Sequence, residues 1–494
     1  MTVNSFEFPI FFLIVFVVYY LPFVRKTAKI QNTWLLLVSY GFYGMTDWKM
    51  LALLVGSTVL FYILGHHIKK QMERKCERCA SIITTIGVLI GVGILVFFKY
   101  LDFFISSIAE MINLFGLNLS WSALHIILPV GVSFFTFKLI SYIVEIYRQH
   151  IEPTSSVIDF AIYIAFFPTI LSGPIDKPDK FIPQIQPPRI FDYPLAVDGC
   201  RQVLWGIMIK MCIADNLTAI TDTAWGRIDS LPASTLIIAA LLYPLQLYAD
   251  FDGYSHMAIG VAKILGIKVE RNFNHPLIAR NMAEYWRRWH ISLTSWITTY
   301  IFMPLNISFR NLGKLGIWLA AFINLVVIGL WHGANWTYVV FGIYHGLLFI
   351  PLVFSGAFGK NKKMRPVSFA IGKTSIELPG WTNCMKMLLT YCLVAIGHVI
   401  FRAPDIASVT DYMSAMVNFS SFSMPHLDIG VVAMALALLL PLLDWFCRKD
   451  EHPLQTLCKY MSNRRWMRWI LYYLIIIIIL RYQGRSAEFI YFQF

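Results

Sequence analysis

The chain has 494 residues, of which 57% are hydrophobic and only 14% are charged, and its mean hydropathy is +0.62. Soluble proteins carry about 25% charged residues, so this composition excludes an ordinary soluble domain and predicts a protein embedded in a lipid bilayer. The net charge of +13 is explained by basic cytoplasmic loops and anionic lipid headgroups, and we predict no nucleic-acid partner.

Long apolar segments recur along the whole chain. They are, in order, 8–24, 34–64 (which reads as two short pieces), 82–98, 126–144, 160–175, 203–213, 236–248, 317–330, 336–354, 385–401, 429–446 and 466–480. Because a crossing helix needs about 20 apolar residues, we predict an all-α polytopic membrane protein with roughly 11 transmembrane helices, forming a single membrane domain over residues 1–494. Short or interrupted segments predict re-entrant or interfacial helices, since such backbone is tolerated at membrane depth only where protein surrounds it.

The first apolar segment predicts the orientation of the chain. It is too long for the hydrophobic part of a signal peptide, and no small-residue cleavage pattern follows it, so we expect it to stay as the first span. Arg25, Lys26 and Lys29 come directly after it. Since cytoplasmic loops are rich in Lys and Arg, we place this loop in the cytoplasm and the amino terminus outside. Basic clusters at 360–365 and 448–468 mark further cytoplasmic loops.

Three stretches interrupt the apolar pattern: 173–188 is rich in proline, 263–290 is basic, and 360–379 contains a lysine cluster. The prolines exclude a continuous helix in the first stretch. Among the eight cysteines only Cys76 and Cys79 form a C-x-x-C pair, which alone is weak evidence for zinc, and we predict no metal site. Asp250 and Asp252 resemble a carboxylate pair, but positions i and i+2 lie on different helix faces. We expect them in a turn, where Asp caps the following helix.

The end of the basic stretch has an amphipathic pattern. Trp286, Trp289, Leu293 and Trp296 recur at spacings of three and four, as on one face of a helix. This pattern favours a helix that lies at the membrane–water interface on anionic lipid. The alternative is a helix that dips inward and carries His290 toward a buried site.

His332 stands in the sequence Trp-His-Gly-Ala-Asn-Trp (331–336), between two apolar segments. An ionisable side chain inside a membrane is costly, and its presence indicates function. His290 lies 42 residues earlier, about 63 Å along a single helix, so the two histidines must belong to different elements. His345 is about 20 Å from His332 along a continuous helix, unless Gly333 or Gly342 bends the chain.

A buried imidazole is kept neutral by desolvation, which makes it a general base for a hydroxyl group that attacks a carbonyl carbon. The alternative for His332 is a hydrogen bond that packs two spans together, a role that fits His125, His256 and His398 better. Asn335 lies about one helical turn away. It either orients the His332 ring or donates to an oxyanion, or it makes a hydrogen bond between helices.

Seven stretches of the sequence, in the same order, resemble the bacterial branch of the membrane-bound O-acyltransferase family, in particular members that O-acetylate alginate and related polymers. The matching stretches are Leu-Pro-Val-Gly-Val-Ser-Phe-Phe-Thr-Phe (128–137), Ser-Gly-Pro (172–174), Asp-Gly-Tyr-Ser (252–255), Asn-Phe-Asn-His-Pro (272–276), Tyr-Trp-Arg-Arg-Trp-His-Ile-Ser-Leu (285–293), Gly-Leu-Trp-His-Gly-Ala (329–334) and Phe-Ile-Tyr-Phe-Gln-Phe (489–494).

This resemblance implies tilted helices around a central funnel, with a catalytic core at about 128–405. It implies that His332 is the essential histidine and that His290 is the second catalytic histidine. The predicted residues of the funnel or substrate site are Asn335, Trp331, Trp289, Arg287 and Tyr285.

The implied reaction moves an acyl group, expected to be acetyl, from a cytoplasmic thioester such as acetyl-CoA to a hydroxyl acceptor, without a bound cofactor. The basic stretch 263–288 would meet either the phosphates of coenzyme A or lipid headgroups. The implied partners are the lipid bilayer of the bacterial inner membrane, an SGNH-type periplasmic acyl-transfer protein, and a polysaccharide or envelope polymer as final acceptor. Alternative functions are D-alanyl transfer from a carrier protein, a transporter with a histidine proton relay, or a non-catalytic scaffold.

Overall fold

A computed structural model of the chain describes residues 5, 7–116, 126, 128–359, 366–371, 374–425, 430–461, 464–484, 487 and 489–490. His125, the basic cluster 360–365 and the last four residues of the terminal motif lie outside the described residues. The chain divides into two compact units, Met1–Ile207 with Tyr254–Glu270, and Met208–Gly253 with Arg271–Phe494. The single membrane domain over residues 1–494 stays a prediction, and each unit is described by itself.

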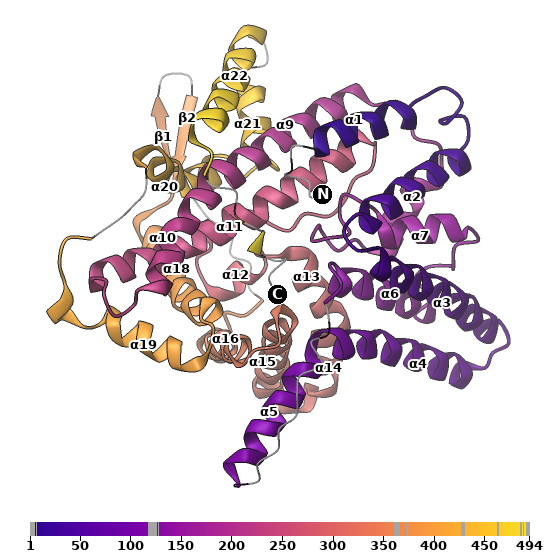
Figure 1. Cartoon of the computed structure of the whole chain (residues 1–494), viewed down its shortest axis with the longest axis horizontal. Helices are drawn as coiled ribbons and strands as arrows, with labels where there is room; N and C mark the ends of the chain where they lie inside the picture. The colour runs from indigo at the N-terminus through magenta and orange to yellow at the C-terminus, as the bar shows by residue number, and fades with distance from the viewer. Residues whose placement is uncertain are drawn as a thin grey trace. The chain divides into compact units, whose positions relative to one another are not determined.

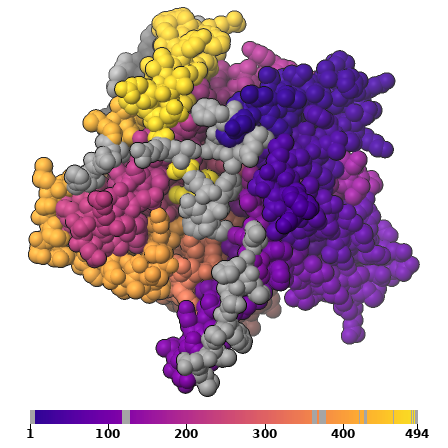
Figure 2. Space-filling model, in the orientation of Figure 1, coloured from indigo at the N-terminus to yellow at the C-terminus, as the bar shows by residue number. Residues whose placement is uncertain are grey.

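The first unit is helical. Its helices are α1 (Phe8–Tyr19), α2 (Ala28–Gly44), α3 (Trp48–Glu73), α4 (Glu77–Leu95), the π-helix η1 (Val96–Tyr100), α5 (Leu101–Leu114), α6 (Val132–Tyr147), α7 (Val157–Ala165), α8 (Pro178–Ile185), most of α9 (Tyr193–Ile209) and the end of α11 (Ala233–Ile264). Helices α3 and α4 pack against each other and both pack against α6 (Figure 1). Helices α1 to α4, indigo to purple in Figure 2, form one continuous surface.

The second unit is also helical, with one small sheet. Its α-helices are α10 (Asp215–Gly226), the first part of α11, α12 (Met282–Trp286), α13 (Ile291–Ile297), α14 (Met303–Ser308), α15 (Gly313–His332), α16 (Trp336–Leu347), α17 (Ile350–Phe354), α18 (Trp381–Arg402), α19 (Ile406–Met416), α20 (Val431–Phe446), α21 (Pro453–Tyr460) and α22 (Arg465–Tyr482). Two π-helices, η2 (Lys210–Ala214) and η4 (Thr298–Phe302), and three 3-10 helices, η3 (Pro276–Ile278), η5 (Arg310–Leu312) and η6 (Phe419–Ser421), are also described. The strands are β1 (Val367–Ile371) and β2 (Thr374–Leu378). Strands β1 and β2 form an antiparallel hairpin in which Val367 pairs with Leu378.

The described helices confirm an all-α polytopic membrane protein, with the β1–β2 hairpin as a small exception. Seven of them are long and apolar enough to cross a bilayer: Trp48–Glu73, Glu77–Leu114, Tyr193–Gly226, Ala233–Ile264, Arg310–His332, Trp336–Phe354 and Trp381–Arg402. Two shorter apolar helices are Phe8–Tyr19 and Val431–Phe446. The predicted segment 34–64 is divided between α2 and α3, and the Asp47 side chain caps the start of α3. Helices α6 and α7, with 16 and nine residues, are too short to cross fully, as expected for re-entrant elements.

One sequence-based interpretation needs correction. Asp250 and Asp252 do not lie in a turn, because α11 is continuous from Ala233 to Ile264 and both carboxyl groups are buried inside it. Their different faces are confirmed: Asp250 pairs with Lys210, whereas Asp252 bonds to Tyr248. Cys76 and Cys79 form a disulfide just before and within the first turn of α4.

Candidate active site

The α15–α16 hairpin positions His332. Helix α15 ends at His332, and α16 starts after Asn335, whose side chain accepts a hydrogen bond from the Thr337 backbone N–H at 3.0 Å. The two helices approach closely because glycine faces backbone: a Cβ on Gly329 would lie 2.2 Å from the Tyr338 carbonyl oxygen, and one on Gly342 would lie 2.7 Å from that of Leu325. The turn between the helices therefore holds His332 at the end of a tightly packed hairpin.

The same turn uses both polar atoms of Asn335. Its Oδ1 caps α16, and its Nδ2 donates to the carbonyl oxygen of Pro404 at 2.6 Å. This geometry favours the structural alternative for Asn335, a hydrogen bond between helices, over a role in orienting the His332 ring or in stabilising an oxyanion. The chain also turns at Gly333, so His345 does not continue the helix that carries His332.

His290 breaks the predicted amphipathic helix. The chain forms α12 and α13 with His290 between them at φ 44° and ψ 53°, a left-handed conformation that non-glycine residues rarely adopt. Trp286, Trp289 and Trp296 are all buried. One continuous interfacial helix was therefore the wrong interpretation, and the alternative that carries His290 inward describes the fold. Such strained residues concentrate at functional sites.

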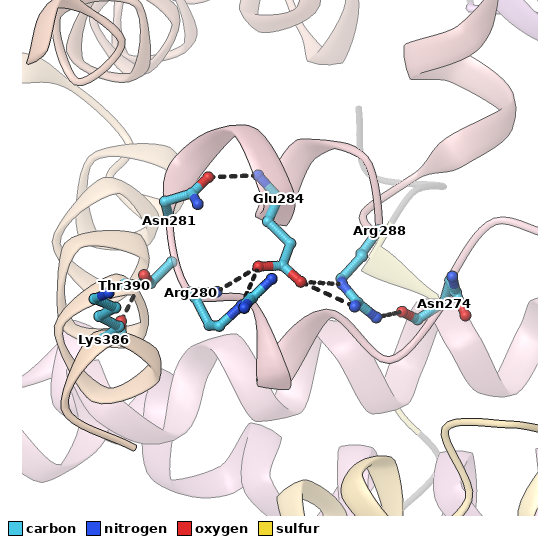
Figure 3. A network of polar contacts seen from close by, with 7 residues as sticks. All are labelled: Asn274, Arg280, Asn281, Glu284, Arg288, Lys386 and Thr390. Atoms are coloured by element: carbon cyan, nitrogen blue, oxygen red, sulfur yellow. Dashed lines mark hydrogen bonds and ion pairs between the residues drawn. The ribbon is translucent and has the colours of Figure 1, made fainter. Parts of the chain in front are cut away.

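A buried carboxylate holds α12 in place. Glu284 accepts hydrogen bonds from the Arg280 side chain at 2.9 Å and from the Arg288 side chain at 3.0 Å, and Asn281 caps the helix through the Glu284 N–H (Figure 3). Arg288 also donates to the Asn274 carbonyl oxygen at 2.9 Å. This network joins the stretch 272–276 to the stretch 285–293, so two of the motifs found in the sequence form one local structure.

His290 and His332 lie together in an aromatic environment. Their ring centroids are 6.4 Å apart, and the Trp331 ring lies 5.3 Å from His290 and 5.1 Å from His332. Phe251 packs edge-on against His290 at 4.6 Å, and Phe401 packs edge-on against His332 at 5.0 Å. Both histidines are buried, with exposed fractions of 0% and 3%. Folding thus brings together two imidazoles that lie 42 residues apart in the sequence.

The electrostatics of His290 follow from this burial. Desolvation lowers the pKa of His290 to about 3, so its imidazole is neutral at neutral pH. A neutral ring has one donor and one acceptor nitrogen, and it can therefore accept a proton or orient a polar group.

The other predicted funnel residues fall into two groups. Tyr285 and Trp289 are buried and stacked, with centroids 5.3 Å apart, and Trp289 also contacts Phe273 at 5.0 Å. Arg287 is exposed. Within the basic stretch, Lys263 pairs with Asp198 at 2.7 Å, and Arg280 and Arg288 pair with Glu284. Lys268, Arg271 and Arg287 are exposed cations of the same stretch.

Several residues near the site were missed from the sequence. Phe251, Phe341 and Phe401 surround the histidines but carry no local motif, because they come from α11, α16 and α18. A second polar group contains His275, whose Nδ1 lies 3.1 Å from Asp444 and whose Nε2 lies 3.2 Å from the Asp450 carbonyl oxygen. The Tyr248 hydroxyl donates to the same Asp444 oxygen at 3.0 Å. The stretch 272–276 was one of the matching stretches in the sequence, but no role was assigned to His275 there.

A buried ion cluster connects the carboxy-terminal segment to α11. Lys210 lies 2.7 Å from Asp215 and 2.5 Å from Asp250, and all three side chains are almost fully buried. Lys210 also donates to the Ala487 carbonyl oxygen, and the Ile490 N–H donates to Asp250. Phe489 contacts Phe251, which itself packs against His290, at 5.9 Å.

Comparisons with known proteins agree with this architecture. The sequence profile of MBOAT, the membrane-bound O-acyltransferase family, matches residues 147–360. The probable alginate O-acetylase AlgI of Pseudomonas aeruginosa is 33% identical over 474 residues, covering 92% of this chain and 84% of that protein. The protein of the same name from Pseudomonas putida is 30% identical over 525 residues, covering 100% of both. A peptidoglycan O-acetyltransferase of Helicobacter pylori is 30% identical over 444 residues, covering 82% of this chain and 77% of that protein.

The fold and its apolar helices define a multi-pass membrane protein, and these matches show that the chain belongs to the membrane-bound O-acyltransferase family. It is an O-acyltransferase: an enzyme that moves an acyl group to a hydroxyl oxygen.

Proposed function

We propose that this enzyme transfers an acetyl group from a cytoplasmic thioester, acetyl-CoA, to a hydroxyl acceptor for O-acetylation of an exopolysaccharide or another envelope polymer, with His332 as general base. The proposal rests mainly on the packing of His332 beside His290, among the rings of Trp331, Phe251 and Phe401. The alginate and peptidoglycan activities named for the relatives support acetyl as the acyl group and a polymer as the final acceptor.

In the proposed step, the His332 ring takes the proton of the acceptor hydroxyl while the oxygen attacks the thioester carbonyl carbon. The new C–O bond forms, the C–S bond breaks, and the imidazolium returns its proton to the leaving thiolate. The products are an ester and a free thiol, and His332 is regenerated. General-base catalysis of this kind contributes about 10²- to 10⁴-fold in rate.

His290 has a supporting role in this proposal. Its ring is neutral, buried and held by Phe251 and Trp331. It orients the acceptor hydroxyl or the thioester carbonyl beside His332. Tyr285, Trp289 and Trp331 form the walls of the site, and the exposed Arg287 is available to contact the donor phosphates.

The proposed setting is the bacterial inner membrane with the amino terminus outside, since Arg25, Lys26 and Lys29 follow the first helix. The proposed acceptor protein is an SGNH-type periplasmic acyl-transfer partner, which then esterifies the polymer. Family membership favours these steps over transport or a scaffold role. D-alanyl transfer from a carrier protein differs in the donor, so a charged carrier supplied in place of acetyl-CoA distinguishes it.

The test is incubation of the purified protein with labelled acetyl-CoA, with and without an SGNH-type partner. We expect label to appear on the partner only when both proteins are present. His332→Ala is expected to lower the transfer rate by at least about 100-fold while the protein stays folded and inserted. His67→Ala, at an exposed histidine of α3, is the matched control and should retain transfer. Full activity of His332→Ala would refute the assignment of the base.

A further inference from the structure

A second group of histidines lies beside the proposed active site. His345 of α16 and His398 of α18 are 0% and 2% exposed, and Trp286 of α12 and Tyr243 of α11 are buried with them. We call these four residues the second histidine cluster. The Trp286 ring lies 5.3 Å from His345, and the Tyr243 ring lies 6.0 Å from His398.

Helices α16 and α18 meet closely at this cluster. A Cβ on Gly397 would lie 2.6 Å from His345 Nε2, so glycine at this position lets α18 approach the imidazole. Phe341 links the two histidines, with its ring 4.4 Å from His345 and 6.3 Å from His398. His398 therefore lies among polar and aromatic side chains that are far from it in the sequence.

Five of the six side-chain nitrogen and oxygen atoms in the cluster make no hydrogen bond with the residues that the structure describes. In the part of the chain that the structure describes, the Tyr243 hydroxyl, Trp286 Nε1, both ring nitrogens of His345 and Nδ1 of His398 have no hydrogen-bond partner. A buried polar atom without a partner lowers stability, and folded proteins leave few of them. Several such atoms in one place indicate a group that the described residues do not supply.

The cluster adjoins the reacting centre. Phe401 contacts His398 at 6.2 Å and His332 at 5.0 Å, and Phe341 lies 6.3 Å from each of these two histidines. Trp289 packs against His398 at 5.6 Å. Trp289 also lines a small apolar cleft together with Tyr285, Pro244, Tyr391 and Val394. The cluster is therefore one aromatic layer from His332 and close to a cleft.

We propose that the second histidine cluster binds an uncharged hydrogen-bonding group of a substrate, a carbonyl or a hydroxyl, while His332 carries out the transfer. This inference rests on the proposed function. An indole N–H needs an acceptor, whereas a hydroxyl and a neutral imidazole can both donate and accept. None of these side chains carries a permanent charge to neutralise an ion, and an unpaired ion is strongly disfavoured in such surroundings. The amide carbonyls of the thioester donor and the hydroxyls of the acceptor share the required chemistry.

The test removes the nitrogens and keeps the ring. Transfer by His398→Phe and His345→Phe is measured with the donor varied at saturating acceptor, and then with the acceptor varied at saturating donor. We expect KM for one substrate to rise at least tenfold while kcat changes less than threefold. The substrate whose KM rises identifies the source of the bound group. His398→Gln, which retains hydrogen-bonding atoms, should restore part of the affinity.

A packing role predicts a different result. Replacing an unpartnered buried polar group with an apolar one leaves stability unchanged or raises it, so loss of affinity without loss of melting temperature marks a binding role. If a phenylalanine variant does not fold, Trp286→Phe removes a single unpartnered N–H instead. The matched control is Tyr344→Phe on α16, whose hydroxyl is already bonded to the Leu393 carbonyl oxygen at 2.9 Å and whose loss should not change KM.

The outcomes separate the two proposals. A wild-type protein that transfers no acyl group overturns the proposed function and this inference with it. An active wild type whose phenylalanine variants and Trp286→Phe keep both KM values overturns this inference alone.

Discussion

The ring centroids of His290 and His332 lie 6.4 Å apart, although the two residues come from different elements and are 42 positions apart in the sequence. The indole of Trp331 contacts both imidazole rings and helps to hold them at this distance. The backbone also positions the rings: His290 occupies a left-handed conformation, and His332 ends a helix at a glycine turn.

The backbone strain at His290 leads to a prediction about His290→Gly and His290→Ala. Both variants lose the imidazole, so both should lose most of the transfer activity. Glycine adopts positive φ without a steric penalty, whereas alanine does not. We therefore expect His290→Gly to be the more stable of the two by about 1 kcal/mol, measured as a higher midpoint of thermal unfolding in detergent. Equal melting temperatures would indicate that the left-handed conformation is not retained.

Gly329 sets the distance between α15 and α16. In Gly329→Ala, the new methyl group would meet the Tyr338 carbonyl oxygen at 2.2 Å, which forces the helices apart. We expect a loss of about 1–3 kcal/mol in stability and a fall in transfer rate, because His332 moves with the end of α15. Thermal unfolding and acetyl transfer measure the two effects. Gly93→Ala on α4 is the control, since nothing lies within 4 Å of its Cβ position, and it should unfold at the wild-type temperature or above.

The buried cluster around Lys210 should respond asymmetrically to substitution. Lys210→Met leaves two buried carboxyl groups without a cation, and removal of one partner from a buried ion pair costs about 3–5 kcal/mol. Asp215→Asn is expected to cost much less, because Lys210 still pairs with Asp250 at 2.5 Å. The yield of folded protein on size-exclusion chromatography and its melting temperature are the measurements. If Asp215→Asn proves as damaging as Lys210→Met, charge pairing does not explain the cluster.

His275 predicts a pH-dependent component of stability. Burial acts to lower its pKa, but the hydrogen bond and negative charge of Asp444, with the Asp450 carbonyl oxygen and the Asp252 charge, outweigh this and raise the pKa of His275 above 6.5. Both ring nitrogens face acceptors, so the bound form is the cation. A raised pKa in the folded state contributes stability that is fully present below pH 6.5 and is lost as the pH rises through the folded pKa.

Melting temperatures of the wild type and of His275→Gln, recorded from about pH 5.5 to 9, check this sign. The wild type should lose stability toward alkaline pH, and the variant should lack that component of the slope. The Tyr248 hydroxyl also bonds to Asp444 and is unchanged in the variant, so the comparison isolates His275. Parallel curves for the two proteins would contradict the assignment.

Local sequence features predicted the α15–α16 hairpin well. Two apolar segments flank a histidine, a glycine and an asparagine, and the structure ends one helix at His332 and caps the next with Asn335. The same kind of reasoning failed at 284–296, because the spacing of the tryptophans fits a continuous helix. The break at His290 depends on contacts with the stretch 272–276, such as the bond from Ile291 N–H to the Asn272 carbonyl oxygen at 2.7 Å. It failed again at Asp250 in the middle of α11, because the burial of this carboxylate depends on the ion pair with Lys210, which is far from it in the sequence.

The sequence by itself determined that this protein lies in a lipid bilayer, and it singled out His332 and His290 as candidates for function. Long apolar segments require a lipid bilayer, and an ionisable ring within them is energetically costly, so it indicates a function. The tertiary structure alone decided which rings meet. Three helices, α11, α16 and α18, supply the other rings near the site: Phe251, Phe341, Phe401, His345 and His398. The distances between these rings are set by packing between helices, which involves residues far apart in the chain and has no periodicity that a single sequence displays.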